Sequence, residues 1–549
     1  MLPFVLVLAV EGGLRLFGYG HSYPLFVPVP DTDDFLRVNR KVVFRFMVDE
    51  AKTPKLWIRP VFFRRHKTPE TFRIFVQGGS TAEGYPYGYG ASPAGMLQQR
   101  LQRTFPELEI DVITTAMSAV NTYTLLDFSS EILEQDPDAV VIYAGHNEYV
   151  GILGVGSGFS VGRWRPAVLS FLRFKDWRIF QLARGAFLAL GPKGKARDDN
   201  RTLMATIVAE KRIPYGSSLY RRGLEQYRAN LRALLKRYRR AGVPVFIGTM
   251  VSNERDQPPF VSDHGSGADG DAWRRHLHAG DAALESGNQR AAVAAFEAAI
   301  AVDDLHAEGH FGLGRALDAR GRHSDARHAY VAARDRDQLR FRAPTEINRI
   351  LRRVAAEQGA HVVEVEDAFA LEARDGIVGH DLMLEHLHPN LDGYFIIADA
   401  FYDALREQRM IGPWDRPISR GQARQEIPVT EVDRLYGEYR IGYLTSDWPF
   451  SDRKQRFRLG RASDRVEEIA QSYYRGPKDW PVAMRDLLDH YRRVDDLTEA
   501  ARVAVLLAEA FPNRAQDQQT AAELLAAAGR TDAEVYRRRA APSIRPPAF

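Results

Sequence analysis

Five short apolar runs, rich in β-branched residues and separated by long stretches of other character, constrain the fold of this chain more than any other feature of its sequence. They are Phe72–Gln77, Ile110–Thr114, Ala139–Tyr143, Val243–Thr249 and His361–Val365. Mostly apolar runs of this length, without strict alternation, are typical of strands buried on both faces of a parallel sheet. We therefore expect an α/β fold, with the connecting helices packed on the two faces of the sheet.

Helices are expected between these runs. Aromatic and Leu residues recur every three or four positions between the third and fourth runs, which is the pattern of one apolar helix stripe. They are Tyr220, Leu224, Tyr227, Leu231, Leu234 and Tyr238. The basic residues around this stripe are interpreted as a solvated helix face, with a polyanion-binding patch as the alternative. Further helices are predicted over Ser92–Thr104, Leu125–Gln135, Thr345–Glu357 and Leu391–Glu407, the first with Ser92 as its N-cap.

The fourth and fifth runs are separated by far more chain than one helix requires, and a connection of this length usually marks an insertion. Five small or aromatic positions in it recur 34 residues later. They are Gly280, Gly287, Ala292, Phe296 and Ala299, followed by Gly314, Gly321, Ala326, Tyr330 and Ala333. This period is similar to that of tetratricopeptide repeats, in which two antiparallel helices pack through small residues. An ordinary pair of helical hairpins is the alternative.

The chain becomes helical again after a Pro- and Arg-rich connection that follows Glu407. Helical patterns over Leu487–Tyr491, Ala500–Ala510 and Ala521–Ala528 predict further, more degenerate repeats. Because stacked repeats need neighbours, we expect both helical regions to pack on each other, on the α/β core or on a protein partner.

Composition excludes several kinds of function. The 549 residues include no Cys, which rules out disulfides, thiolate metal sites and a Cys nucleophile. Lys and Arg total 75 against 71 Asp and Glu, and the resulting net charge of +4 is too small to indicate a nucleic-acid partner.

A candidate nucleophile follows the first apolar run, in the sequence Gly78-Gly79-Ser80-Thr81. A Ser at the carboxyl end of a parallel strand, on a glycine-rich turn toward a helix, has its hydroxyl and backbone N–H directed at the ligand crevice. The glycine spacing fits neither the dinucleotide-binding fingerprint nor the phosphate loop. A turn without chemical function is the remaining alternative for this motif.

The third run leads into Gly145-His146-Asn147-Glu148 at the neighbouring crevice. An Asn amide in this place can donate a hydrogen bond to an oxyanion that develops during acyl transfer. The alternative is a loop Asn that only satisfies nearby backbone groups.

Glu385 and His388 lie three residues apart, just before the last predicted helix of the α/β core. On one helical turn or in a tight loop, this spacing places a carboxylate beside an imidazole, where it orients the ring and stabilises its protonated form. Two alternatives stay open: His386 and His388 form a metal-binding pair, for which no third ligand is obvious, or both are solvated.

In this order along the chain, the three segments resemble blocks of the SGNH (GDSL-type) hydrolase superfamily. The Gly-Asp-Ser block of that family aligns with residues 78–80, its Gly-x-Asn-Asp block with residues 145–148, and its Asp-x-x-His-Pro block with residues 385–389. The resemblance covers about half of the chain and implies a flavodoxin-like parallel sheet.

The resemblance also implies a role for each matching residue. Ser80 corresponds to the nucleophile, His388 to the base and Glu385 to the orienting acid of a catalytic triad. The Ser80 N–H and the Asn147 side chain correspond to oxyanion-hole donors. No metal and no organic cofactor is implied.

The chain departs from the family pattern in two ways. Three residues stand where the family has Asp, namely Gly79, Glu148 and Glu385, the last of which lengthens the arm of the triad acid. The second family block, which supplies a Gly N–H to the oxyanion hole, corresponds to residues 116–121 and lacks that Gly. Because a backbone N–H does not require Gly, we expect the amide of Val120, or that of its neighbour Asn121, to take this place.

Some members of the superfamily are membrane-anchored proteins with tetratricopeptide repeats, and Val10–Gly18 is similar to the exit of such an anchor. The ten residues Met1–Val10 are wholly apolar, but a bilayer-spanning helix requires about 20. We therefore expect them to be the end of a longer hydrophobic helix that continues upstream. The prediction is membrane attachment with the catalytic domain outside the cytoplasm, although the basic residues between positions 15 and 41 favour the opposite orientation by the positive-inside rule.

The sequence thus predicts five parts of the chain. They are an anchor remnant (1–20), two parts of a hydrolase domain (21–261 and 339–408), inserted repeats (262–338), and a linker with degenerate repeats (409–549). The Gly-, Trp- and Phe-rich segment 150–212 is expected to cover the crevice without indicating its substrate.

The predicted function is hydrolysis of an ester by a Ser-His-Glu triad, with an acylated glycan as one candidate substrate. One alternative is an O-acyltransferase that uses the same site. The other is an inactive scaffold whose helical repeats bind a protein partner.

Overall fold

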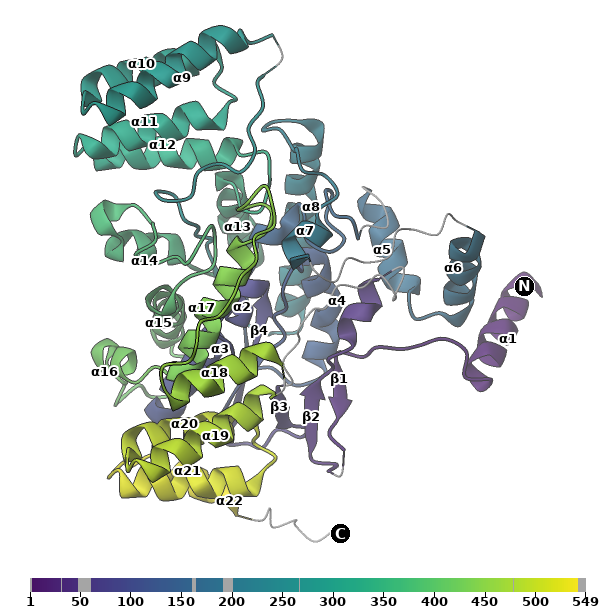
Figure 1. Ribbon diagram of the computed structural model, residues 1–549. Helices are drawn as coiled ribbons and strands as arrows, with labels where there is room; N and C mark the ends of the chain where they lie inside the picture. The colour runs from purple at the N-terminus through teal and green to yellow at the C-terminus, as the bar shows by residue number, and fades with distance from the viewer. Residues whose placement is uncertain are drawn as a thin grey trace.

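The core of the molecule contains a five-stranded parallel sheet with the strand order β5-β4-β6-β7-β8. Its strand β4 is labelled near the centre of Figure 1. The computed structural model describes residues 2–30, 32–47, 61–159, 164–190, 201–265, 267–476 and 478–541. The strands are β4 (Thr71–Gly78), β5 (Glu109–Thr114), β6 (Ala139–Tyr143), β7 (Val245–Gly248) and β8 (His361–Val363). Each predicted apolar run forms one strand, the last two shorter than expected. In chain order the arrangement is 2-1-3-4-5, which is that of flavodoxin-like folds, so the predicted α/β sheet is confirmed.

Two groups of helices cover this sheet. α3 (Pro93–Thr104) packs against α15 (Leu391–Glu407), while α8 (Ser218–Arg240) packs against both α4 (Thr122–Leu133) and α13 (Thr345–Gln358). With right-handed crossovers, the direction in which the chain moves along the sheet decides which face a connecting helix covers. The connection from β4 to β5 runs in the opposite direction to the later connections, which produces the two groups. Every residue of the middle strand β6 is buried as a result.

Two helix starts show how the sequence sets these boundaries. The Ser92 hydroxyl accepts a hydrogen bond from the Gly95 N–H at 3.0 Å, so α3 begins as predicted. α4 begins at Thr122 rather than at the predicted Leu125, because Asn121 acts as its N-cap and accepts from the Tyr123 N–H at 3.1 Å.

A small antiparallel sheet precedes the central one and was not predicted. Its strands β1 (Phe26–Pro28), β2 (Phe35–Val38) and β3 (Phe62–Arg64) are too short for a periodic pattern to be visible in the sequence. The sheet extends the main core, because the Phe63 and Phe75 rings meet edge to face with centres 6.0 Å apart.

Two helical hairpins lie between β7 and β8, at the position predicted for the insertion (Figure 1, top). They consist of α9 (Gly270–Glu285), α10 (Gln289–Val302), α11 (Ala307–Ala319) and α12 (His323–Arg336). Small residues allow the close helix contacts, because a Cβ on Gly280 or Gly312 would collide with the Phe296 ring. The segment is therefore helical as expected, and its assignment to tetratricopeptide repeats stays a prediction.

Six further helices form the C-terminal region and surround an apolar cluster of their own. They are α17 (Glu431–Thr445), α18 (Arg465–Arg475), α19 (Trp480–Arg493), α20 (Leu497–Ala510), α21 (Ala515–Ala527) and α22 (Ala533–Ala540). Tight contacts join this region to the α/β core. A Cβ on Gly90 would collide with the Pro428 carbonyl, and one on Gly437 of α17 would collide with the Tyr87 ring. The C-terminal helices thus pack on the core, which is one of the arrangements expected.

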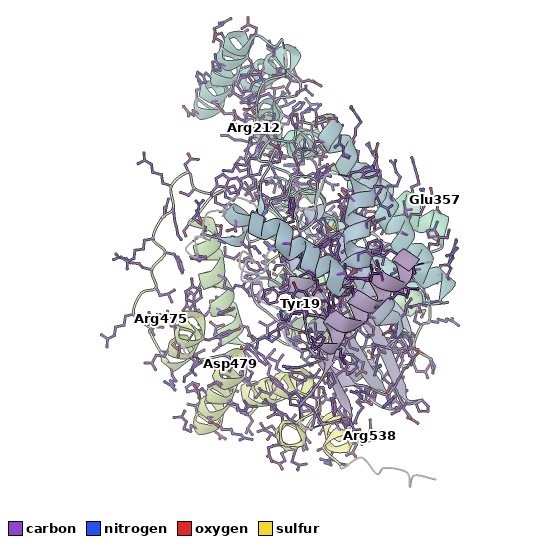
Figure 2. The ribbon with its side chains drawn as sticks, turned by 90° about the vertical axis from the view of Figure 1, so that its right-hand side faces the viewer. Tyr19, Arg212, Glu357, Arg475, Asp479 and Arg538 are labelled. Carbon is purple, nitrogen blue, oxygen red and sulfur yellow. The ribbon has the colours of Figure 1, made fainter. Side chains whose placement is uncertain are left out.

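The N-terminal helix α1 (Leu2–Leu16) lies beside α6 (Arg178–Leu190) on one side of the molecule (Figures 1 and 2). The Glu11 carboxylate fixes the pair, because it accepts hydrogen bonds from the Arg178 and Ile179 N–H groups at 3.1 and 3.0 Å. Within the described residues, no helix combines the length and apolar character that crossing a membrane requires. The remaining helices are α2 (Ser80–Glu83), α5 (Arg165–Phe174), α7 (Leu203–Ile207), α14 (Val365–Glu372) and α16 (Arg420–Gln425).

Candidate active site

Ser80 lies at the carboxyl end of strand β4 of the parallel sheet, where it is the first residue of the one-turn helix α2. Two glycines make this sharp turn possible. A Cβ on Gly78 would collide with the Tyr143 carbonyl of the neighbouring strand, and Gly84, with a φ of 87°, ends the turn in the left-handed region. As a first-turn residue, Ser80 has an N–H group without an acceptor inside its helix.

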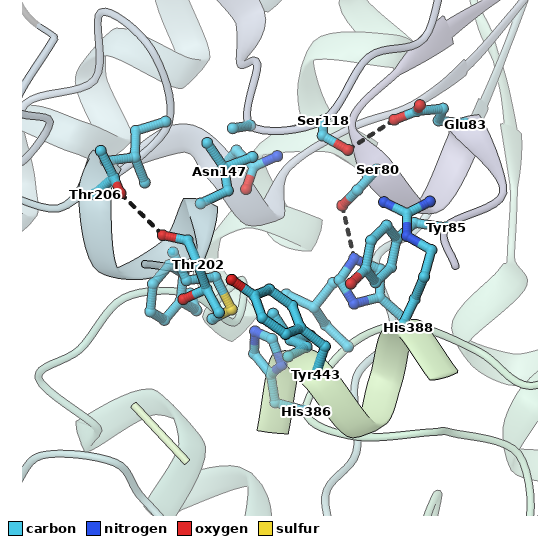
Figure 3. Close-up of a pocket in the computed structure, with 18 of the residues that line it drawn as sticks. Ser80, Glu83, Tyr85, Ser118, Asn147, Thr202, Thr206, His386, His388 and Tyr443 are labelled. Carbon is cyan, nitrogen blue, oxygen red and sulfur yellow. Dashed lines mark hydrogen bonds between the residues drawn. The ribbon is translucent and has the colours of Figure 1, made fainter. Parts of the chain in front are cut away.

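The structure brings Ser80, His388 and Glu385 together at this edge of the sheet. Figure 3 shows the contact between Ser80 and His388. His388 Nε2 lies 2.8 Å from Ser80 Oγ, and His388 Nδ1 contacts a carboxylate oxygen of Glu385. Ser80 and His388 are 308 residues apart in the chain, so the fold rather than local sequence creates this contact. The three groups form a continuous path from hydroxyl to imidazole to carboxylate.

The loop that carries Glu385 and His388 accommodates the longer arm of Glu. The Glu385 carboxylate accepts backbone hydrogen bonds from the His386 and His388 N–H groups at 2.7 and 2.9 Å. The loop is closed by an antiparallel bridge between Met383 and Pro389. The carboxylate is therefore held within its own loop, which fixes it against the ring that it contacts.

Electrostatics keep the His388 ring neutral. Burial lowers the pKa of His388 to about 3, and the positive charge of Arg440 acts in the same direction, whereas Glu83 acts in the opposite one. A base must be neutral to accept a proton, and this lowered pKa leaves His388 neutral at pH 7.

Asn147 and the backbone of Val120 meet Ser80 from the opposite side. Asn147 lies in a turn of 3-10 helix after β6, and its side chain lines the same cavity as Ser80 (Figure 3). A Cβ on Gly79 would lie 2.8 Å from Asn147 Nδ2 and 3.8 Å from the Val120 carbonyl oxygen. Gly79 therefore allows both groups to approach the Ser80 backbone closely.

The segment predicted to supply the second oxyanion-hole N–H, through Val120 or Asn121, has an unusual backbone conformation. Ala119, not Val120, has the positive φ, 63°, and it lines the cavity while the Val120 side chain is buried in the core. Among the described residues, the Val120 N–H has no hydrogen-bond acceptor. Because a buried N–H rarely stays unpaired, the Val120 amide fits a ligand-binding role, whereas the side chain of Asn121 is occupied as the α4 cap.

A cavity of about 490 Å³ opens over these groups. Segment 201–207, containing α7, forms part of its wall, as expected for the covering segment 150–212, of which 160–163 and 191–200 lie outside the described residues. The C-terminal helices supply residues that the sequence did not indicate. They are Tyr436, Arg440, Tyr443 and Leu444 of α17 and Tyr474 of α18. No local motif marks them, because they join the site only through tertiary packing.

Glu148, which stands where the family has Asp, is a structural residue. Its carboxylate is fully buried and accepts hydrogen bonds from the Thr122 hydroxyl at 2.8 Å and from the Gln226 side-chain amide at 2.6 Å. Burial raises the pKa of Glu148 to about 7. Glu148 thus ties the Asn147 turn to α4 and α8.

The alternative of a metal site can be compared with the same geometry. Ligand atoms of Glu385, His386 and His388 lie within 4.8 Å of one another, so Glu385 would be the third ligand that the sequence did not make obvious. However, the Nδ1 atoms of both His rings already contact the Glu385 carboxylate, and His388 Nε2 faces Ser80. Both ring nitrogens of His388 are thus engaged, which favours the triad, whereas His386 Nε2 has no hydrogen-bond partner among the described residues.

No protein-family model and no curated protein matches the sequence. Among solved structures, the chain is similar to a GDSL-like lipase from Parabacteroides merdae ATCC 43184, with 12% identity, a TM-score of 0.30 and coverage of 61% of this chain and 94% of that one. A GDSL-like lipase from Bacteroides thetaiotaomicron VPI-5482 has 11% identity, a TM-score of 0.28 and coverage of 63% and 93%. A lipase/acylhydrolase from Enterococcus faecalis has 13% identity, a TM-score of 0.27 and coverage of 61% and 97%.

Proposed function

We propose that this protein is a serine-dependent hydrolase of carboxylic esters. The observation that carries the proposal is the path from the Ser80 hydroxyl through the His388 ring to the Glu385 carboxylate, at the floor of a cavity. A Ser, a base and an orienting carboxylate in hydrogen-bonding contact are the signature of nucleophilic acyl transfer. An inactive scaffold has no need to keep this arrangement.

Each group has one task in the proposed reaction. His388 Nε2 takes the Ser80 hydroxyl proton while Ser80 Oγ bonds to the ester carbonyl carbon, and the Ser80 and Val120 N–H groups with the Asn147 amide stabilise the oxyanion. The carbonyl re-forms, the alcohol leaves with the proton from His388, and an acyl-enzyme remains. Water then repeats the sequence, losing its proton to His388, and releases the acid and free Ser80.

The cavity wall supports an acylated glycan as one candidate substrate. Tyr85, Tyr436, Tyr443 and Tyr474 line the cavity and offer aromatic surfaces with polar edges, which suit a polar ring-shaped ligand. A glycan hydroxyl in place of water would turn the same acyl-enzyme into an O-acyltransferase, and product analysis with a sugar acceptor separates the two reactions.

The proposed hydrolysis is tested with 4-nitrophenyl acetate and a matched pair of serine variants. Ser80→Ala is expected to lower kcat by about a thousandfold or more, because it removes the nucleophile. Ser118→Ala is the comparison, since Ser118 lines the same cavity but donates its hydroxyl hydrogen bond to Glu83 at 2.7 Å. Similar losses in the two variants, or no turnover by the wild type of a panel of short- and long-chain esters, contradict the proposal.

We also propose that α1 and α6 attach the protein to a membrane surface, with the catalytic domain outside the cytoplasm. Apolar side chains on both helices face solvent, including Phe4 (71% exposed), Leu6 (66%) and Phe187 (76%). Cosedimentation with phosphatidylglycerol vesicles is expected to weaken in a Phe4→Ser/Phe187→Ser variant and to persist in Leu371→Ser, which alters an exposed apolar residue on α14. Equal sedimentation of all three proteins contradicts the proposed surface.

A further inference from the structure

Arg440 projects from the C-terminal helix α17 into the cavity that contains Ser80 and His388. Its guanidinium carbon lies 4.3 Å from the centre of the Tyr85 ring and 5.6 Å from that of Tyr436. Its Nη1 donates one long hydrogen bond, of 3.4 Å, to the Pro86 carbonyl. Aromatic faces therefore hold the group in place without neutralising its charge.

No carboxylate among the described residues lies within ion-pair distance of Arg440. The other arginine of the cavity wall, Arg201, differs in this respect, because it pairs with Asp447 at 3.1 Å. Glu83 also lines the cavity, but its carboxylate accepts the Ser118 hydroxyl and forms no ion pair with Arg440. Arg440 is thus a cation of the cavity wall without an ion-pair partner. Burial acts to lower the pKa of Arg440, whereas Tyr85, Tyr436 and the more distant Glu83 carboxylate act in the opposite direction and raise it above its ordinary value.

A guanidinium has five N–H donors, and the Pro86 contact uses one of them. Removing an unpaired charge from water is costly unless a partner compensates for it. A planar fork of free donors is also the geometry that binds carboxylate and phosphate groups in a bidentate manner. The missing partner of Arg440 is therefore expected to be an anionic group of a ligand.

We propose that Arg440 binds an anionic group of the substrate, so that the ester cleaved at Ser80 carries a carboxylate, phosphate or sulfate. This inference rests on the proposed hydrolase function for the identity of the ligand, and on the cavity geometry for its charge. It makes Arg440 a specificity-determining residue supplied by the C-terminal helices.

Tyr85 sets the spacing between the anion site and the reacting groups. The centre of its ring lies 4.6 Å from that of His388 and 4.3 Å from the Arg440 guanidinium carbon. One aromatic ring, that of Tyr85, thus separates the Arg440 guanidinium from the His388 side chain. Because Arg440 lowers the pKa of His388, a bound anion would offset this effect and make His388 a stronger base when the substrate is in place.

Esters that differ in one charged group test the proposal. 4-Nitrophenyl acetate is compared with mono-4-nitrophenyl succinate, which carries its carboxylate on the acyl side. Phenyl acetate is compared with 3-acetoxybenzoate and with 3-acetoxyphenyl phosphate, which carry their anion on the alcohol side. The wild type is expected to prefer at least one anionic ester by about tenfold in kcat/KM. These comparisons show whether the preferred anion lies on the acyl or the alcohol side of the ester, and whether it is a carboxylate or a phosphate.

Variants of α17 assign this preference to its source. Arg440→Gln is expected to abolish it, and Arg440→Lys to keep part of it, because Lys retains the charge without the fork. The matched control is Arg434→Gln, since Arg434 is on the same helix but pairs at the surface with Glu431 and Glu438. If Arg440 had only a structural role, its replacement would lower kcat/KM for charged and neutral esters alike. Arg440→Gln is also expected to raise the pKa that governs kcat/KM for 4-nitrophenyl acetate, because Arg440 lowers the pKa of His388. A purely structural role predicts no such change.

Binding of succinate, inorganic phosphate and sulfate to the Ser80→Ala protein provides a readout without turnover. A further Arg440→Gln change is expected to weaken binding of at least one of them by about fivefold or more. If binding depends on Arg440 but no ester is cleaved by the wild type, the anion site stands and the hydrolase function fails. If esters are cleaved but neither preference nor binding depends on Arg440, the anion site is overturned and the hydrolase function stands.

Discussion

Helices α9–α12 of the insertion and helices α17–α22 of the C-terminal region are both runs of short helices, packed on their neighbours around apolar clusters of their own. They nevertheless relate to the cavity in different ways. The C-terminal region supplies Tyr436, Arg440 and Tyr474 to its wall, whereas none of the described residues of α9–α12 lines it. A helical pattern in the sequence thus does not tell whether a region builds the active site.

The difference arises from how each region meets the α/β core. Ion pairs join the base of the insertion to the core, such as Arg334 with Glu254 at 3.5 Å and Arg255 with Asp318 at 3.0 Å, and Ile377 packs in the apolar cluster of the insertion. The C-terminal region instead packs so tightly on the core that a Cβ added at Gly90 or Gly437 would collide with neighbouring atoms. Tight packing next to the reacting residues makes α17 part of the site, and the insertion stays available for the predicted protein partner.

The largest expected contrast comes from removing one buried aromatic side chain in each region. Trp480→Ala removes a ring whose Nε1 donates to Asp433 at 2.8 Å, and Phe296→Ala removes a fully buried ring of the insertion. Each change is expected to cost about 3–5 kcal/mol of unfolding free energy in its own region. Only Trp480→Ala should lower kcat/KM for 4-nitrophenyl acetate, by about tenfold or more, because it loosens the support of α17. Equal kcat/KM values of the two variants would contradict the statement that only the C-terminal region supports the site.

A smaller contrast is expected when a methyl-bearing side chain is forced into each contact. Gly437→Val pushes α17 away from Tyr87, and Gly312→Val presses on Phe296 inside the insertion. Overpacking of this kind costs about 1–3 kcal/mol. Thermal unfolding should register both changes, and ester turnover should fall only for Gly437→Val. A comparable loss of turnover in Gly312→Val would show that the insertion is coupled to the site.

The pH dependence of kcat/KM is expected to respond to a charged residue of α17 but not to one of the insertion. His388 is neutral, and active as a base, above its pKa of about 3, so kcat/KM should change by less than about twofold between pH 5 and 7. An imidazole with the ordinary value of about 6.5 would lose most of its activity over this range. Arg315→Gln on α11 should leave the profile as it is, unlike a change at Arg440. A steep loss of activity around pH 6 in the wild type would contradict the lowered pKa of His388.

The smallest effects are expected at exposed ion pairs of the two regions. Arg315 pairs with Asp281 in the insertion, and Arg434 pairs with Glu431 in α17. Replacing either arginine by Ala should change the unfolding free energy by less than about 1 kcal/mol, because solvent screens both pairs. Chemical denaturation measures this, and a larger cost at either position would reveal a role that the surface geometry does not provide.

Much of the candidate site could be predicted from the sequence, because several of its residues lie at strand ends. The apolar runs located β4 and β6, so Ser80 and Asn147 could be placed at one edge of the sheet, and the spacing of Glu385 and His388 indicated their contact. The contact between His388 and Ser80 could be inferred only from the resemblance to a family, since more than 300 residues separate the two.

The rest of the site depends on tertiary packing that leaves no local pattern. Arg440 lies on an ordinary amphipathic helix, and only the contact of α17 with Tyr87 brings it to the cavity. The left-handed backbone at Ala119 could not be predicted either, because residues other than Gly adopt it only where their surroundings impose it. The strands β1–β3 escaped prediction because three or four residues are too few to show a period.

Labelling with a fluorophosphonate probe, followed by peptide mass spectrometry, tests the central claim that Ser80 is an activated nucleophile. One covalent adduct is expected, on the peptide that contains Ser80, which is absent in Ser80→Ala and forms about a hundredfold more slowly in His388→Ala. The absence of any adduct in the folded wild type, or an adduct on another residue that persists in Ser80→Ala, would contradict this claim.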